Sequence, residues 1–239
     1  MRLGLVAAVL GVWVFLTSTG GVSPLILPEL PVVVDSFVNV FTRTETWGQA
    51  AITVLEMLAA FAIAAVAGLL TGFLVSRGRV AALAAEPLLA WGYMFPFALI
   101  YPMLLLWAGV GVESKIMYGA LGAFFPIAYN TIRGLRSVDK KYLQVGQAYG
   151  ASRLQTDLNI KLGAARPMIL AGLRIGSSVV AIYVVLAELL GSNQGLGHAI
   201  EQASSRLKTA DSYATVALLI LITVILQRIM ERLLRTRHE

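Results

Sequence analysis

The sequence has no cysteine, two histidines and few charged residues, and each shortage excludes a class of site. Without cysteine, the chain has no disulfide, thiol nucleophile or cysteine-ligated metal, and we expect no metal site at all. Charged residues make up 13% of the 239 residues, against roughly 25% in a typical soluble domain. So few charges cannot cover a globule with polar surface. Because hydrophobic residues make up 58%, we predict that lipid surrounds the chain.

Six apolar stretches approach the roughly 20 residues that cross a bilayer. They cover about 3–18, 50–75, 88–110, 116–132, 168–190 and 213–234. The first stretch, behind Arg2, also resembles the apolar region of a signal peptide, but no small-x-small cleavage site follows it. We predict an all-α integral membrane protein with six transmembrane helices, forming a single domain over residues 1–239.

Lysine and arginine fall mostly on one side of this arrangement. With the N-terminus inside, only four of the 19 lie outside, namely Arg43, Lys115, Arg206 and Lys208. Because cytoplasmic loops are enriched in these residues, we predict that both termini are cytoplasmic. The basic residues occupy short loops rather than one amphipathic face, which argues against a nucleic-acid partner. The outside segment 20–47 has three prolines near its start, followed at 32–41 by a predicted helix along the membrane surface.

The longest polar stretch is the loop at 133–167, which we predict to form two short helices. Ser137 is expected to be the N-cap of the first, with Asp139 in its first turn and Gly150 ending it in a left-handed conformation. Ser152 and Gln155 have capping-box spacing for the second.

The second predicted helix has an apolar stripe beside a charged one. The apolar stripe consists of Leu154, Leu158 and Leu162, and the charged stripe of Arg153, Asp157 and Lys161. Gly163 is expected to stop this helix, and Pro167 to lie in the first turn of the fifth span. Such a helix suits the groove of a partner protein, although leucines resting on the bilayer would explain the pattern equally well.

The loop resembles the cytoplasmic signature of permease subunits of type I ABC importers. Gly150, Ile160 and Leu162 are in register with that signature inside "GASRLQTDLNIKL". The sequence departs from it where a Glu-Ala-Ala triplet would be Gln144, Val145 and Gly146, and where Gly163 replaces a proline. On this resemblance residues 133–167 are named the coupling loop. The residues expected to contact an ATPase are Gln144, Gly150, Ala151, Ser152, Arg153, Leu154, Leu158, Ile160 and Leu162.

Other stretches resemble the nitrate/sulfonate/taurine branch of the same family, among them "SKIMYGALGAFFPIAYNTIRGLRSVD" and "AELLGSNQGLGHAI". The resemblance implies a MetI-like fold in a bacterial inner membrane and a homodimer carrying two cytoplasmic ATPase subunits. It also implies an external binding protein that delivers a small solute, such as a sulfonate, taurine or nitrate. The chain itself would be a transport subunit and not an enzyme. It would bind no cofactor, since the partner ATPase holds ATP and Mg²⁺.

Two carboxylates lie within predicted spans, where ionisable groups usually face an interior or a cavity. Glu188 is either a residue of the translocation pathway or a cap for the backbone of the following glycine loop. Glu56 is either a pathway residue or a side chain close to the headgroups. Further pathway candidates are Ser177, Tyr183, Asn130 and Pro96.

The loop "GSNQGLG" after the fifth span is expected either to project as an external gate or binding-protein contact, or to form a plain turn. Its candidate residues are Ser192, Asn193, Gln194, Gly195 and Gly197. Pro96 and Pro102 are expected to bend the third span. Gly172 and Gly176 are expected to let another helix approach closely.

Two other functions fit a six-span chain. An intramembrane serine protease is excluded, because the two histidines, His198 and His238, lie outside the predicted spans and no base is available there. An ion-coupled secondary transporter is the remaining alternative. It would typically show inverted repeats or a chain of buried carboxylates, and neither is visible.

Overall fold

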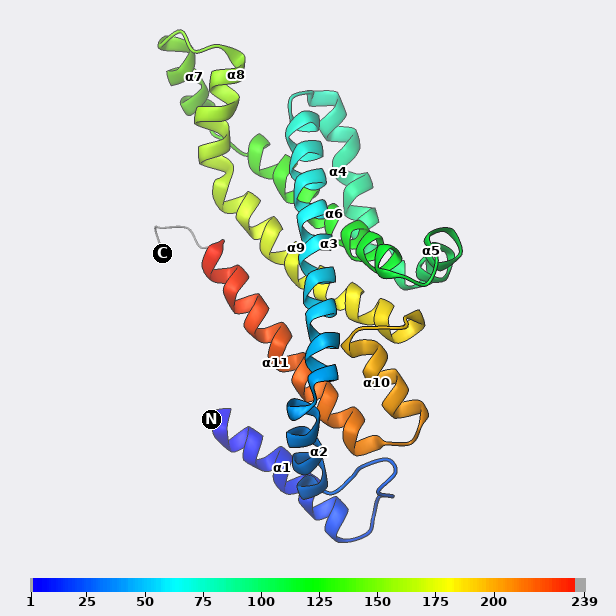
Figure 1. The fold of residues 1–239 in the computed structure, drawn as a ribbon. Coiled ribbons are helices and arrows are strands. Elements are labelled where there is room, and N and C mark those ends of the chain that lie inside the picture. The colour runs from blue at the N-terminus through cyan, green and yellow to red at the C-terminus, as the bar shows by residue number, and fades with distance from the viewer. Residues whose placement is uncertain (1, 235–239) are drawn as a thin grey trace. The chain divides into compact units, whose positions relative to one another are not determined.

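The computed structural model describes residues 2–234, and within that range every regular element is a helix (Figure 1). The chain divides into two compact units, each described by itself. The first comprises Met1–Val54 and Glu188–Val224, and the second Leu55–Ala187 and Ile225–Glu239. That residues 1–239 form a single domain stays a prediction.

The first unit contains α1 (Arg2–Ser18), α2 (Leu30–Thr42), the start of α3 (Thr44–Ser76), α10 (Leu196–Ser205) and the start of α11 (Thr209–Leu233). Trp13 joins three of its segments: the indole N–H donates to the carbonyl of Pro28 at 3.0 Å, and the ring packs edge-on against Tyr213. The helix expected at 32–41 is present as α2, with Pro31 in its first turn. Its place at a membrane surface stays a prediction.

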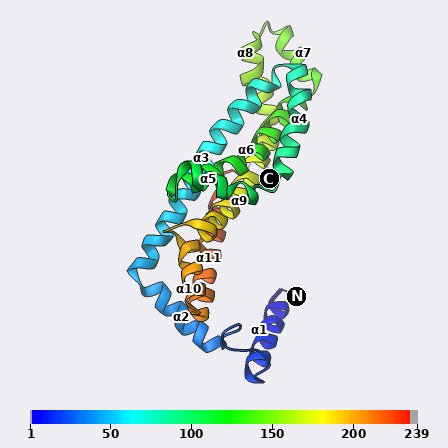
Figure 2. The same ribbon diagram turned by 90° about the vertical axis from the view of Figure 1, so that its right-hand side faces the viewer.

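The second unit contains the remainder of α3 and α11, together with the elements between them. These are α4 (Arg79–Met94), η1 (Phe97–Leu99), α5 (Tyr101–Ala108), α6 (Val112–Arg136), α7 (Lys140–Ala148), α8 (Arg153–Gln155), the π-helix η2 (Thr156–Lys161) and α9 (Leu162–Gly191). Helices α4 and α6 pack side by side (Figure 2). Only two residues separate α3 from α4.

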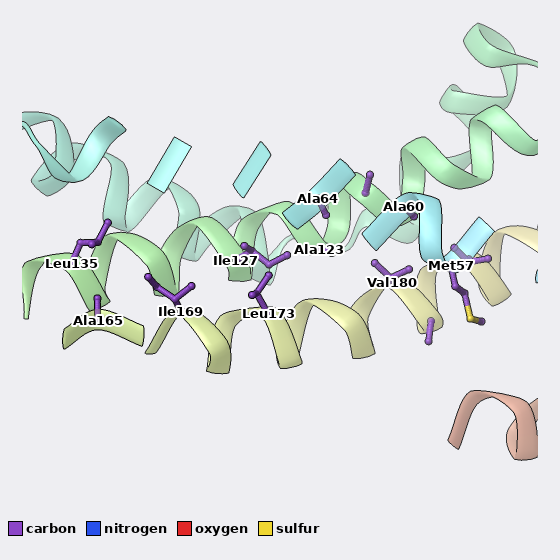
Figure 3. Packing of buried hydrophobic residues seen from close by; sticks show 13 residues of the cluster. Met57, Ala60, Ala64, Ala123, Ile127, Leu135, Ala165, Ile169, Leu173 and Val180 are labelled. Carbon is purple, nitrogen blue, oxygen red and sulfur yellow. The ribbon is translucent and has the colours of Figure 1, made fainter. Parts of the chain in front are cut away.

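The core of the second unit forms where α3, α6 and α9 meet, and Figure 3 shows α6 and α9 side by side through Ile127, Ile169 and Leu173. Glycines allow this approach. A Cβ added at Gly172 would lie 2.7 Å from the Cβ of Asn130, and one at Gly176 2.6 Å from Ile127. Small residues let helices pack closely in lipid, where no hydrophobic force drives association. The packing role predicted for the two glycines is confirmed.

The third expected span is broken rather than gently bent. Helix α4 ends at Met94, Phe95 is extended as the residue before a proline usually is, and Pro96 precedes η1. The segments on the two sides of the break are bent by 69°. The bend expected at Pro96 is therefore present, but the one expected at Pro102 is not. Pro102 lies in the first turn of α5, where a proline fits without bending the helix.

Among the described residues, three helical runs are long and apolar enough to cross a membrane: α3, Thr156–Ser205 and α11. The bent pair around Pro96 would make a fourth. Helix α1, with 17 residues, and α6, which carries Glu113 and Lys115, occupy the other two expected spans without meeting this measure. Fourteen of the 25 residues of α6 are buried, and they include the polar residues Ser114, Lys115 and Thr131.

Candidate functional site

Two polar structures carry most of the residues expected to function, and the first is the coupling loop. Asp139 caps α7, because its carboxylate accepts a hydrogen bond from the N–H of Lys141 at 3.0 Å. This backbone hydrogen bond, together with a contact of 3.1 Å to Lys141 Nζ, lowers the pKa of Asp139. Ser137 is instead the C-cap of α6 and donates its hydroxyl to the carbonyl of Gly134. The predicted N-cap at Ser137 is thus wrong, since α6 runs through to Arg136 and leaves Asp139 as the first residue free to cap α7.

The break between α7 and α8 matches the prediction. Gly150 has a φ of +69°, and the N–H of Ala151 donates to the carbonyl of Gly146 at 2.9 Å. This 6→1 bond is typical of a helix ended by a left-handed glycine. The capping box is also present: the N–H of Ser152 donates to Gln155 Oε1 at 2.8 Å, and the N–H of Gln155 to Ser152 Oγ at 3.3 Å. Both helix ends are therefore fixed locally.

The second short helix does not stop at Gly163. It passes through the π-helix η2 directly into α9, and Pro167 lies inside α9 rather than in its first turn. Gly163 keeps a helical φ, with open space where a Cβ would lie, so nothing there ends the helix. Pro167 has no N–H to donate to the carbonyl four residues earlier, yet α9 continues through it. The coupling loop and α9 thus form one helical run.

Asp157 holds this helical run against the end of α3. Its carboxylate accepts a hydrogen bond from Arg77 Nε at 3.1 Å and forms an ion pair with Lys161 Nζ at 2.7 Å. The guanidinium of Arg77 lies over the ring of Phe73, 4.6 Å from its centroid. Asp157 is 9% exposed and sits on the π-helix, an element found often at functional sites. The three charged residues are named the Asp157 clasp.

The apolar side of the coupling loop faces outward. Leu154, Leu158 and Leu162 are 54%, 46% and 40% exposed. Gln144, Ser152 and the aromatic side chain of Tyr149 are also exposed, while Ile160 lies against Gly146. The Arg153 side chain lies outside the described residues. A groove of about 710 Å³ with both charged and apolar lining runs past Leu154 and the Asp157 clasp, and an apolar groove of about 600 Å³ past Leu158 and Leu162. The loop therefore offers a shaped, partly apolar surface.

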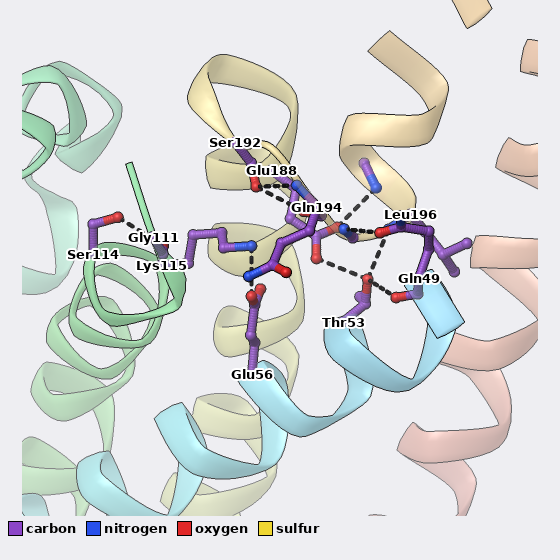
Figure 4. A network of polar contacts seen from close by, with 12 residues as sticks. Gln49, Thr53, Glu56, Gly111, Ser114, Lys115, Glu188, Ser192, Gln194 and Leu196 are labelled. Atoms are coloured by element: carbon purple, nitrogen blue, oxygen red, sulfur yellow. Dashed lines mark hydrogen bonds and ion pairs between the residues drawn. The ribbon is translucent and has the colours of Figure 1, made fainter. Parts of the chain in front are cut away.

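The second polar structure surrounds Glu188 in the first unit (Figure 4). Glu188 Oε2 accepts a hydrogen bond from the N–H of Gly197 at 2.7 Å, and Oε1 accepts one from the hydroxyl of Thr53 at 2.7 Å. Thr53 in turn accepts from the N–H of Leu196 at 2.9 Å, and the Gln49 amide oxygen from the N–H of Gly195. These residues are named the Glu188 network.

The Glu188 network satisfies the first N–H groups of α10, which would otherwise have no partner. A carboxylate at a helix N-terminus is also favoured by the helix dipole. Glu188 therefore caps the glycine loop, as one of its two predicted roles requires, and a part in the pathway stays a prediction. Gly195 and Gly197 are buried rather than projecting. The hydroxyl of Ser192 donates to the carbonyl of Gln194 at 2.6 Å, which forms a tight turn, and Asn193 is exposed.

Glu56 is buried, and its distance from the headgroups stays a prediction. It is 1% exposed and forms an ion pair with Lys115 (Figure 4), whose side chain is fully buried. Lys115, predicted to lie in an outside loop, is in fact in the first turn of α6. Breaking such a buried pair costs about 3–5 kcal/mol, because the remaining charge stays buried without compensation.

The other four pathway candidates all lie in the second unit. Asn130 donates its amide to the carbonyl of Pro126 at 2.8 Å, and Ser177 lies 3.1 Å from the amide oxygen of Gln227 on α11. Tyr183 packs between the rings of Phe97 and Tyr118. Pro96 is exposed at the break. Contact of these four with a substrate stays a prediction, and no metal-binding cluster is found among the residues described.

Sequence reasoning missed the partners that come from far along the chain. Arg77 and Asp157 are 80 positions apart, and Thr53 and Glu188 are 135 apart. The contact of Arg174 was also missed. Arg174 lies well inside α9 and donates to the carbonyl of Leu234, directly after α11. Neither Thr53 nor Arg77 has a neighbouring residue in the sequence that points to its distant partner.

The sequence is similar to a family of transport proteins and to individual transport permeases. The family model described as "Binding-protein-dependent transport system inner membrane component" matches residues 64–237. The aliphatic sulfonates transport permease protein SsuC of Bacillus subtilis, itself named putative, is 31% identical over 87% of this chain and 75% of its own. The taurine transport system permease protein TauC of Escherichia coli is 28% identical over 100% of this chain and 90% of its own.

Among solved structures, a chain of the MetNI methionine ABC transporter in an inward-facing conformation is similar in fold. The aligned region covers 81% of this chain and 95% of the transporter chain, with a TM-score of 0.62 and 20% sequence identity.

Proposed function

Because the chain belongs to the family of binding-protein-dependent transport system inner membrane components, we propose that it forms the pathway of an importer for a small organic sulfonate or similar anion. The chain is the permease subunit of an ABC importer with a MetI-like fold, and not an enzyme. An ABC importer permease works with an ATPase and a binding protein. The sulfonate follows from the names of the relatives SsuC and TauC.

In this proposal, two copies of the chain pair as a homodimer in a bacterial inner membrane, with cytoplasmic termini. Two ATPase subunits, which hold ATP and Mg²⁺, dock on the coupling loops, and a binding protein docks on the opposite face. The observation that carries the docking is the coupling loop itself. Its helices are fixed by a capping box and a left-handed glycine, yet Tyr149 is 87% exposed at the tip. An ordered loop with exposed apolar side chains suits a partner surface.

The proposal is tested by purifying the tagged chain with its ATPase and reconstituting both in liposomes with the binding protein. We expect two permeases and two ATPases by native mass spectrometry. We also expect taurine uptake that stops when the ATPase cannot hydrolyse ATP. Uptake driven by an ion gradient, with the permease alone, would contradict the proposal and favour a secondary transporter.

The docking surface has its own variant and control. Tyr149→Ala is expected to lower ATPase recovery in co-purification, whereas Tyr93→Ala removes an exposed tyrosine of α4 and should leave recovery unchanged. Equal recovery with both variants would show that the tip of the coupling loop does not contact the ATPase.

A further inference from the structure

The four basic residues predicted to lie outside have two kinds of surroundings. Lys115 is fully buried and paired with Glu56. The other three, Arg43, Arg206 and Lys208, all line one cavity of about 390 Å³ within the first unit. The positive-inside tendency leaves few cations on the outer face of a membrane protein. Three of the four predicted outside cations are thus gathered around one cavity.

The cavity, named the basic cavity, is formed by the start of α3, by α10 and by the start of α11. Its lining is mainly polar, and amides from Gln49, Asn193 and Gln202 contribute to it together with His198. A volume of 390 Å³ lies near the lower end of the range for small-molecule sites, roughly 300–1,000 Å³. The basic cavity is thus of a size for a small, polar molecule.

The charges of the basic cavity do not cancel. The three cations stand beside two acids, Asp211 and Glu45. Asp211 lies 4.0 Å from Arg43. In the described part of the chain, neither Arg206 nor Lys208 forms a salt bridge. Two cations without a paired acid at one cavity favour an anionic ligand.

The backbone between these two cations is held in one conformation. Leu207, between them, has a φ of +57°, a conformation that is unfavourable for a residue with a side chain. The strained turn is held by the N–H of Lys208, which donates to the carbonyl of Ala203 at 2.9 Å, and by the N–H of Leu207, which donates to Ser204 at 3.0 Å. Strain of this kind persists only where the surroundings impose it.

We infer that the basic cavity binds a small oxoanion, such as the sulfonate group of the transported solute, through Arg206 and Lys208 before the solute enters the pathway. The inference rests on the proposed function for the identity of the solute and for the side of the membrane. It deepens that function by giving the permease an anion site of its own, separate from the binding protein. Carboxylates on the binding protein would offer the same chemistry, so the experiment must separate the two sources.

The test uses the permease–ATPase complex in lipid nanodiscs without the binding protein. Methanesulfonate is titrated by isothermal calorimetry, with neutral dimethyl sulfone as the matched probe. We expect the first to bind and the second not, and Arg206→Gln with Lys208→Gln to weaken methanesulfonate binding about tenfold or more. Arg79→Gln with Arg228→Gln removes the same charge from exposed positions in the second unit and should leave binding unchanged.

The results separate this inference from the proposed function. Equal methanesulfonate binding by the wild type and the Arg206/Lys208 variant overturns the inference. Absence of methanesulfonate binding, with weaker binding-protein docking in the variant, also overturns it, because the cations then serve protein carboxylates. If methanesulfonate binds in an Arg206- and Lys208-dependent way but sulfonate uptake fails in liposomes, the inference stands and the proposed solute is wrong.

Discussion

The Glu188 network and the coupling loop are stabilised in opposite ways. In the network, side chains from α3 and α9 reach the buried backbone of a distant loop, and Thr53, Gly195 and Gly197 have almost no exposure. In the coupling loop, helix ends are capped by residues two or three positions away, and the side chains are largely exposed. Buried polar groups lose more free energy when a partner is removed than exposed ones do. The network should therefore be intolerant of change, and the coupling loop tolerant.

The largest contrast is expected from glycine to alanine substitution. At Gly195, with a φ of +102°, a Cβ would collide with the Glu188 carboxylate, so Gly195→Ala should cost about 2–6 kcal/mol from strain and lost hydrogen bonding. At Gly163 the φ is helical and the space is open, so Gly163→Ala should stabilise by about 0.5–1 kcal/mol. Thermal unfolding in detergent measures both. If Gly195→Ala were as stable as the wild type, the Glu188 network would be wrongly described.

A smaller contrast is expected from two threonines. Thr53→Val keeps the shape but removes one of the hydrogen bonds to Glu188 and the partner of the N–H of Leu196, at about 1–3 kcal/mol for each group. Thr156→Val removes an exposed hydrogen bond to the carbonyl of Ser152 and should change stability by about 0.5 kcal/mol or less. The same unfolding assay compares them. Similar losses in both variants would remove the distinction between the two regions.

The Asp157 clasp sharpens the comparison, because it is the part of the coupling loop that depends on a distant residue. Since Asp157 is little exposed but Arg77 is 42% exposed, Arg77→Gln should cost only about 0.5–1 kcal/mol in stability. It should nevertheless reduce uptake per ATP hydrolysed, because α3 is then no longer tied to the docking surface. Arg77→Lys, which keeps the charge, is the control. Unchanged uptake per ATP in Arg77→Gln would limit the clasp to a structural role.

The smallest effect is expected from pH at the cap of α7. The pKa of Asp139 is lower when folded, so its contribution is present above the unfolded pKa and is lost as pH falls through the folded value. Hydrogen exchange at the amide of Lys141 should therefore accelerate relative to neighbours in acid. Asn also caps helices, so Asp139→Asn should remove this pH dependence while keeping α7 intact. The same acid dependence in both proteins would exclude Asp139 as its source.

Features that depend on neighbouring residues could be predicted from the sequence, and contacts between distant residues could not. Gly150 and the Ser152–Gln155 box were predictable because capping uses residues within a few positions of each other. Hydrophobic runs indicated the helices for the same local reason. The error at Gly163 also has a local cause, since a glycine permits a helix end without requiring one. The Glu56–Lys115 pair and the Asp157 clasp were not predictable, because nothing near either residue in the sequence names a partner on another helix.

The π-helix at Thr156–Lys161 has a consequence for insertions and deletions. A π-turn holds one residue more than an α-turn, and each residue of an α-helix turns the chain by about 100°. Deleting one residue there would let the segment close as an ordinary α-turn through about the same full rotation, so Asp157 would keep roughly its face toward Arg77. Deleting a residue from the regular α-helix that follows would instead rotate everything before it by about 100°, and Asp157 would face away from Arg77 although no charged residue had been lost. The coupling loop should therefore accept a one-residue deletion in the π-helix more readily than one in the α-helix after it.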